Sequence, residues 1–208
     1  MATIYDLKPR FQNILRPLPA KLVLLGITPN TITWLALAGS LVVGGAVFIS
    51  SNHPVSLLLL AVWLLIRMSL NALDGMMARE FRMATSRGAV LNELGDVLSD
   101  LALYLPLAHS SSTAAWPVIA FAFGATLTEL CGVLGQAIGG RRRYEGPMGK
   151  SDRAVLIGAL ALLTALLPAI AGFWGWIFTI AALLTITTCC NRISHALRDT
   201  ELNELDRR

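Results

Sequence analysis

NALDGMMAREFRMATSRGAVLNELGDVLSD, residues 71–100, is the stretch that decides how this chain is interpreted. It places carboxylates and carboxamides in or beside segments apolar enough to lie in a membrane, where a charged side chain costs about 2.5–3.5 kcal/mol on insertion scales. The groups recur at helical spacing, and they are Asn71, Asp74, Asn92, Asp96 and Asp100. A chain that keeps such groups in apolar surroundings is expected to use them.

The composition of the whole chain is that of an integral membrane protein. Of its 208 residues, 55% are hydrophobic and 14% are charged, whereas soluble domains average about 25% charged residues. Six apolar stretches are each close to the roughly 20 residues that span a bilayer as a helix. They cover approximately residues 31–50, 56–78, 89–108, 115–138, 153–171 and 173–191. We therefore predict an all-α integral membrane fold with six transmembrane helices.

The basic residues predict the orientation of these helices. All 17 Lys and Arg residues except Arg67 lie before the first stretch, after the last one, or at the second and fourth links between stretches. By the positive-inside rule, both termini and these two links face the cytoplasm. Because the charges are confined to segment ends, the net charge of +4 does not indicate nucleic-acid binding.

We expect a single domain over residues 1–208. Residues 1–26 are expected to form an interfacial amphipathic segment, because apolar residues there mix with four Lys and Arg residues; a flexible basic arm is the alternative. Residues 27–195 are expected to form the six-helix bundle, and residues 196–208 a cytoplasmic tail. Thr28 or Asn30 can cap the first membrane helix.

The polar faces of the second and third stretches are expected to meet. The link 79–87 is short, so the two helices are antiparallel neighbours whose oxygen-bearing faces lie near the cytoplasmic surface. Oxygen ligands of this kind suit a hard divalent cation that bridges phosphates. Gly75 and Ala78 let a ligand or a helix approach the backbone. Arg79 either pairs with a diphosphate or snorkels to the interface.

The spacing of these residues resembles the signature of the CDP-alcohol phosphatidyltransferase family, D-x2-D-G-x2-A-R-x8-G-x3-D-x3-D. Its eight positions fall on Asn71, Asp74, Gly75, Ala78, Arg79, Gly88, Asn92 and Asp96. The glycines, the alanine and the arginine match, and two of the four aspartates are asparagine. This NALDG…LNELGD form resembles a bacterial subfamily with asparagine at the first and third aspartate positions. The G-x-T-P-N-x-I-T opening at residues 26–33 is also similar to that of the family.

The resemblance implies an enzyme of phospholipid synthesis in the bacterial inner membrane. Such an enzyme transfers a phosphatidyl or other phospho-alcohol group from CDP-diacylglycerol, or a similar CDP-alcohol, to an acceptor alcohol and releases CMP. The resemblance also implies a homodimer among membrane lipids. The ligands of Mg²⁺ or Mn²⁺ would be Asn71, Asp74, Asn92 and Asp96, with Asp96 as the catalytic base. The CDP-binding residues would be Gly75, Ala78, Arg79 and Gly88. The acceptor alcohol is not identified by the sequence.

The two asparagines leave several outcomes open. Each offers a carbonyl oxygen but no charge, whereas four aspartates balance two divalent cations. Glu93 and Asp100, each within a turn of Asp96, are placed to compensate. The site then holds two cations with rearranged ligands, or one cation, or belongs to an inactive relative. The alternative functions are a non-catalytic membrane partner that binds a nucleotide-lipid and has lost turnover, and a small transporter. Clustering of the polar residues near one face argues against transport.

A second group of charges lies deeper in the membrane. Arg67, Asp100 and Glu129 are at a similar depth and are expected to compensate one another, either as a structural ion pair or as an acceptor-orienting group. Lys150 and Arg153 begin the fifth apolar stretch, and the family resemblance makes them candidates for binding an acceptor phosphate. The run Arg141–Arg143 is interpreted as a positive-inside anchor.

Overall fold

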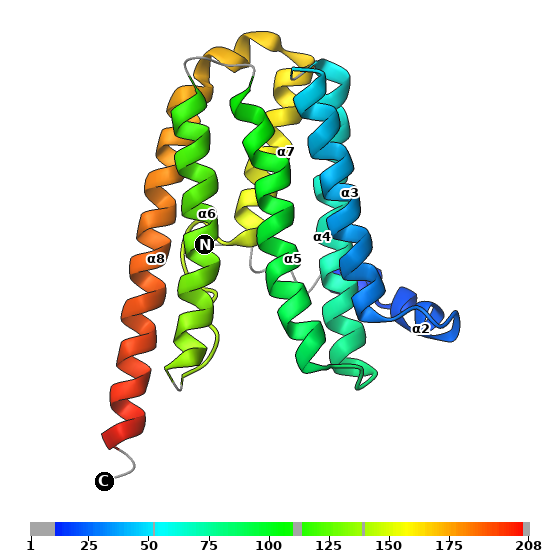
Figure 1. Ribbon diagram of the computed structural model, residues 1–208, viewed down its shortest axis with the longest axis vertical. Helices are drawn as coiled ribbons and strands as arrows, with labels where there is room; N and C mark the ends of the chain where they lie inside the picture. The colour runs from blue at the N-terminus through cyan, green and yellow to red at the C-terminus, as the bar shows by residue number, and fades with distance from the viewer. Residues whose placement is uncertain (1–10, 52, 110–113, 139, 206–208) are drawn as a thin grey trace.

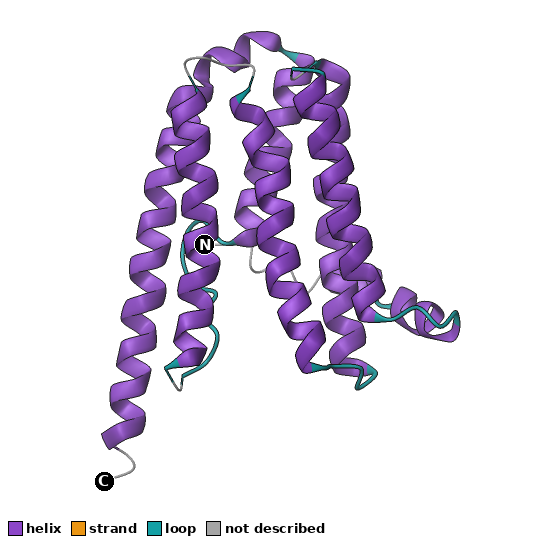
Figure 2. Ribbon diagram, viewed as in Figure 1, coloured by secondary structure: helices purple, strands orange, loops and turns teal. Residues whose placement is uncertain are grey.

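The structure is a computed structural model that describes residues 11–51, 53–109, 114–138 and 140–205. These residues are almost entirely helical and contain no strand (Figure 2). Each of the six apolar stretches is confirmed as helical. The helices are α3 (Pro29–Ile49), α4 (Pro54–Glu80), α5 (Ser86–Tyr104) with the short η1 (Leu105–Ala108), α6 (Ala115–Ala137), α7 (Lys150–Leu166) with η2 (Pro168–Phe173), and α8 (Trp174–Leu205).

Four helical segments of the described chain are long and apolar enough to cross a membrane. They are Pro29–Ile49, Pro54–Glu80, Ala115–Ala137 and the combined run Pro168–Glu201. Helix α5 carries four charged residues, and α7 is only 17 residues long, which sets both apart from the others. Length and composition thus identify four candidate spans, and the count of six transmembrane helices stays a prediction.

The helices run up and down in one bundle (Figure 1). The link between α4 and α5 and the end of α8 lie at one end of the bundle, and η1 and η2 lie at the other. Helix α3 packs on α4 and α5, α4 on α7, α5 on α6, and α6 on α8. This alternation agrees with the pattern of basic links. The placement of the basic end and of both termini in the cytoplasm stays a prediction.

The start of α3 and the start of α5 are fixed by side-chain caps. Thr28 Oγ1 accepts a hydrogen bond from the Thr31 backbone N–H at 3.2 Å, with Pro29 in the first turn. Thr85 Oγ1 accepts from the Gly88 backbone N–H at 3.0 Å. Of the two candidate caps of the first membrane helix, Thr28 is therefore the one used.

The N-terminal segment is helical where the structure describes it. Helix α2 (Pro17–Leu24) packs on α4 and is turned away from the bundle axis (Figure 1). Leu15, Leu22 and Val23 pack against a small buried cluster made of Ile32, Leu73, Met76 and Met77. An apolar face docked at the end of the bundle is the arrangement expected of an interfacial segment; its first ten residues lie outside the described part of the chain.

The main core joins the helices from α3 to α8. Tyr104, Phe121, Phe178 and Trp174 form a run of buried rings whose neighbouring centroids are 5.4, 5.5 and 6.0 Å apart. Trp174 Nε1 donates to Thr164 Oγ1 at 3.0 Å, which satisfies the one polar atom of the indole. This aromatic run begins at Tyr104, one helical turn beyond Asp100, and ends at Trp174, directly after η2.

Helix α7 begins part-way along the bundle rather than at its end (Figure 1). The chain after α6 first runs back along α6, where the Arg143 N–H donates to the Gly132 carbonyl at 3.1 Å. The Gly140 N–H donates to the Gly135 carbonyl at the same distance. A Cβ on Gly132 would lie 2.7 Å from the Arg143 carbonyl, so glycine permits this approach. The returning segment delivers Lys150, the first residue of α7, into the interior.

The contact between α3 and α5 depends on Gly44. A Cβ on Gly44 would overlap the Ala102 carbonyl of α5, whereas a Cβ on the adjacent Gly45 would meet nothing within 4 Å. We expect Gly44→Ala to lower the free energy of unfolding by about 1–3 kcal/mol, the usual cost of overpacking. Gly45→Ala is the matched control and is expected to be neutral or slightly stabilising. Thermal melts of both purified variants in one detergent check this, and equal melting temperatures would contradict the close contact.

Candidate active site

A pocket of about 170 Å³ lies where the start of α3, the end of α4 and the start of α5 meet. Its walls include five residues of the signature: Asp74, Gly75, Ala78, Gly88 and Asn92. Residues of α3 and of the α4–α5 link complete the lining. Signature residues that are up to 18 positions apart in the chain are therefore brought together around one cavity.

Helix α3 contributes two polar side chains that sequence analysis did not assign to the site. Thr33 Oγ1 donates to Asp74 Oδ2 at 3.1 Å, which holds the carboxylate at the pocket wall. Asn30 also lines the pocket, and its Oδ1 lies 2.7 Å from the position that a Cβ on Gly88 would occupy. The signal available in the sequence was the T-P-N-x-I-T opening, which was interpreted as a helix start and a family resemblance but not as part of the site.

Three signature residues lie outside the pocket lining, and they are Asn71, Arg79 and Asp96. Arg79 is exposed, and its Nη1 lies 3.2 Å from where a Cβ on Gly75 would be, so the guanidinium folds over the glycine at the rim. Asn71 faces α5, where its Nδ2 donates to Asp96 Oδ1 at 3.3 Å. The small residue at position 75 thus leaves room for the arginine, and Asn71 belongs to the surroundings of Asp96.

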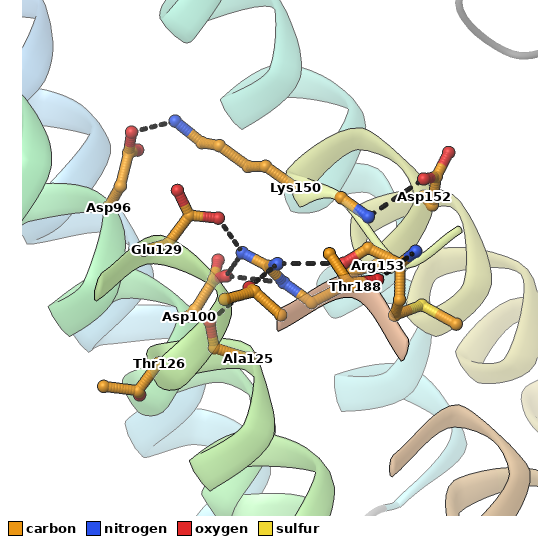
Figure 3. Close-up of polar contacts among 12 residues, drawn as sticks. Asp96, Asp100, Ala125, Thr126, Glu129, Lys150, Asp152, Arg153 and Thr188 are labelled. Carbon is orange, nitrogen blue, oxygen red and sulfur yellow. Dashed lines mark hydrogen bonds and ion pairs between the residues drawn. The ribbon is translucent and has the colours of Figure 1, made fainter. Parts of the chain in front are cut away.

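Asp96 faces the start of α7 and is enclosed by cationic groups. Its Oδ2 forms an ion pair with the Lys150 ammonium, which reaches across from α7 (Figure 3). Its Oδ1 lies 3.5 Å from Arg67 Nη2, in addition to the hydrogen bond from Asn71. The Asp96 side chain is only 8% exposed. The last acidic residue of the signature is therefore oriented by ion pairs and a hydrogen bond from its own protein surroundings.

A buried ion-pair network continues inward from Asp96. Arg67 Nη1 lies 2.5 Å from Asp100 Oδ1, which identifies Asp100 as its main partner. Arg153 lies between two acidic side chains, with Nη2 at 2.8 Å from Asp100 Oδ2 and 2.9 Å from Glu129 Oε1 (Figure 3). The layer expected from Arg67, Asp100 and Glu129 is thus present, but Arg153 is the residue that joins its two carboxylates.

Arg153 has no N–H left over for a ligand. Its Nε and Nη2 donate to Asp100, Nη2 also donates to Glu129, and Nη1 donates to Thr128 Oγ1 and the Met148 carbonyl. The side chain is completely buried. Its geometry is that of a group which positions the carboxylates around it.

Two further arginines, Arg142 and Arg192, complete the network and were missed by sequence analysis. Arg142 Nη2 lies 2.5 Å from Glu93 Oε2 and 3.0 Å from Glu129 Oε2. Arg192 Nη1 donates to the Thr128 carbonyl and lies 3.8 Å from Glu129 Oε1. Burial opposes the charge of Arg142, but Glu93, Tyr144 and Glu129 together outweigh it and raise the pKa of the guanidinium. The arginine run is therefore more than an anchor.

The side chains around the pocket suit one hard divalent cation. Asp74 supplies a carboxylate and Asn92 a carboxamide oxygen at the pocket wall, and these are ligands that Mg²⁺ and Mn²⁺ accept. The other aspartate of the signature, Asp96, is paired with Lys150. Among the described residues, no three His, Cys, Asp or Glu side chains are grouped so as to hold a metal.

The chain is similar to known proteins over most of its length. Residues 26–187 match the CDP-alcohol phosphatidyltransferase family. The inner membrane protein YnbA of Escherichia coli K12 is 45% identical over 195 residues, which cover 94% of this chain and 96% of YnbA. The chain belongs to the CDP-alcohol phosphatidyltransferase family. This family assignment and the relative support an enzyme of phospholipid synthesis in the inner membrane.

Solved structures show the same fold in another member of the phosphatidyltransferases. The phosphatidylinositol phosphate synthase PgsA1 of Mycobacterium tuberculosis with CDP-DAG bound superposes with a TM-score of 0.74 at 21% identity, over 88% of this chain and 94% of that one. The PgsA1 complex with manganese and citrate gives a TM-score of 0.74 at 20% identity, over 88% of each chain. At this level of identity the likeness establishes the fold.

Proposed function

We propose that this phosphatidyltransferase moves a phosphatidyl group from CDP-diacylglycerol, or a phospho-alcohol group from a similar CDP-alcohol, to an acceptor alcohol and releases CMP. The observation that carries the proposal is the pocket in which Asp74, Gly75, Ala78, Gly88 and Asn92 of the family signature converge. We propose that it acts as a homodimer in the inner membrane, with the pocket open to the cytoplasm.

In this proposal the pocket binds the nucleotide end of the donor. Gly75, Ala78 and Gly88 make a wall without bulky side chains, against which a flat ring or a ribose can lie close to the backbone. Arg79 at the rim offers a planar fork of N–H donors that matches diphosphate oxygens. The PgsA1 complex with CDP-DAG supports a donor of this class.

Asp74 and Asn92 are the residues proposed to hold Mg²⁺ or Mn²⁺. Thr33 orients the Asp74 carboxylate at the pocket wall by its hydrogen bond to Oδ2. When bound, the cation neutralises the diphosphate and stabilises the leaving CMP. The PgsA1 complex with manganese supports a divalent cation in a member of this fold.

Asp96 is proposed to take the proton from the attacking hydroxyl group. Its Oδ1 has only long contacts, at 3.3 Å to Asn71 and 3.5 Å to Arg67, so this oxygen can accept a closer donor. Lys150 keeps the other oxygen in place through its ion pair. Of the two candidates for binding an acceptor phosphate, Lys150 has a side chain that is 28% exposed. Arg153 is buried and acts by positioning Asp100 and Glu129.

A second candidate function is a binding partner that retains the donor pocket without turnover. The observation that favours it is the same ion pair, because Lys150 competes with any proton transfer to Asp96. Asn71 and Asn92 further reduce the negative charge available to a catalytic cation. Both functions predict donor binding, and they differ only in CMP release.

The deciding experiment incubates the purified chain with CDP-diacylglycerol and a panel of neutral, amino and phosphorylated alcohols, with and without Mg²⁺ or Mn²⁺. The enzyme reading expects CMP release that depends on both an alcohol and a divalent cation. Saturable donor binding without CMP release under any condition would establish the binding partner instead. Absence of donor binding would contradict both functions.

A further inference from the structure

Lys150 occupies an unusual place for a lysine in this chain. It is the first residue of α7, and the returning segment after α6 brings that helix start inside the bundle. Figure 3 shows its side chain extended away from α7 toward Asp96 on α5. The other lysines of the sequence, Lys8 and Lys21, lie in the N-terminal segment before the bundle. An ammonium group has therefore been delivered to the last acidic position of the signature.

The carboxamides near Asp96 and the pocket match this ammonium. Asn71 presents its Nδ2 to Asp96 and donates a hydrogen bond, which an aspartate at the same position could not do. Asn92 lines the pocket without adding charge. The signature of the family has four aspartates, and here two of those negative charges are missing while the Lys150 ammonium pairs with one of the two that remain. Both features lower the capacity of the centre for divalent cations.

The arginine side chains around the site differ from Lys150 in their carboxylate partners. Arg67 and Arg153 are fully buried and paired with Asp100, and Arg142 is paired with Glu93 and Glu129. Each has a carboxylate partner outside the signature. Arg67 also approaches Asp96 at 3.5 Å, but its shorter contact is with Asp100. Lys150 is different because its ion pair is with Asp96, itself a signature residue, and with no carboxylate outside the signature among the described residues. Its charge is therefore added to the metal centre rather than to the supporting network.

We propose that the centre of this protein takes one divalent cation, held by Asp74 and Asn92, and that the Lys150 ammonium stands in for the second cation. A divalent cation needs several oxygen ligands with compensating charge. An ammonium group is a compact cation with three donors, and it is satisfied by one carboxylate and a few hydrogen bonds. The Asp96 carboxylate alone can satisfy an ammonium group, but it cannot supply the several charged oxygen ligands that a divalent cation needs. The inference rests on the proposed function for the identity of the pocket as the donor site.

The number of cations is measured by titrating the full purified chain with Mn²⁺ in the presence of CDP and following the loss of the free-ion signal in electron paramagnetic resonance. The wild-type chain is expected to bind one Mn²⁺. The triple variant Asn71→Asp, Asn92→Asp, Lys150→Met restores the missing charge and removes the ammonium, and it is expected to bind two. The double variant Asn71→Asp, Asn92→Asp keeps Lys150 and is expected to bind the second ion at least about 10-fold more weakly than the triple variant.

The controls separate the ammonium from a general effect of charge or of misfolding. Lys21→Met removes a lysine from the exposed face of α2 and is expected to leave the titration unchanged. Lys150→Arg added to the two Asn→Asp changes retains the positive charge and is expected to keep the second ion weak. Far-ultraviolet circular dichroism and a thermal melt confirm that each variant is folded before it is titrated.

Two outcomes would overturn the inference. Wild-type protein that binds two Mn²⁺ ions, or none, would show that the centre is not a one-cation site. Equal affinity for the second ion in the double and triple variants would show that Lys150 does not occupy its place. The titration needs no turnover, so absence of CMP release with one bound Mn²⁺ would remove the proposed enzymatic function while leaving the composition of the centre intact.

Discussion

Asp74→Asn and Asp96→Asn are each expected to lower CMP release by at least about 10²-fold, the low end of the effect of losing a positioned acid–base group. The substitutions keep the shape of the side chain and remove its charge. The chain already has asparagine at the two other aspartate positions of the signature, so a third asparagine leaves a single signature carboxylate. No other acidic side chain lines the pocket to replace Asp74.

The matched control for these variants is Glu80→Gln. Glu80 is an exposed acidic residue at the end of α4, less than two turns from Asp74, and does not line the pocket. It is expected to retain wild-type CMP release. Initial rates with CDP-diacylglycerol and saturating Mg²⁺ provide the measurement. Full activity in either asparagine variant would remove that aspartate from the reaction and move the chemistry away from the signature.

Arg67→Leu is expected to lower the free energy of unfolding by about 3–5 kcal/mol, the usual cost of leaving one member of a buried pair behind. The Arg67 side chain is 2% exposed, and its loss removes the partner that lies 2.5 Å from Asp100. Reversible unfolding in mixed micelles of sodium dodecyl sulfate and a mild detergent measures the change. Arg87→Leu, at an exposed arginine in the first turn of α5, is the control and is expected to change stability by less than about 0.5 kcal/mol.

The double variant Arg67→Leu, Asp100→Leu tests the partnership directly. We expect it to be more stable than the sum of the two single changes by about 0.5–3 kcal/mol, the range of coupling between residues in contact. Recovery is expected to be partial, because Arg153 also loses Asp100 and keeps only Glu129 as a charged partner. Additive single effects would mean that Arg67 is held mainly by Asp96.

The helices could be predicted because their signals are local. The apolar runs and the breaks between them predicted every helix from α3 to α8, since hydrophobic length and Gly/Pro-rich links act within a single segment. The boundaries moved by a few residues where caps such as Thr28 and Thr85 decided them. The sequence also predicted that Asp74, Gly75 and Gly88 belong to one site, through the spacing of the signature.

The sequence could not predict which helix covers the other side of the site. Lys150 and Arg153 were expected near the acceptor, but their contacts with Asp96 and Asp100 depend on the segment after α6 turning back along that helix. Arg142 looked like part of a surface anchor, and only this return brings it to Glu93 and Glu129. Thr33 reaches Asp74 because α3 packs on α4, a contact between residues 41 positions apart.

The sequence by itself determined the membrane class, the helices and the residue types of the signature, because hydropathy and helical period are properties of short segments. The tertiary structure alone decided which charged side chains lie around Asp96. The number of cations that a centre can hold depends on the balance of charges from every element packed around it. The two asparagines show the lost carboxylates, but the ammonium that meets Asp96 comes from 54 positions further along the chain. The Lys150 ammonium can affect the site only because folding brings the start of α7 close enough for this side chain to reach Asp96 on α5.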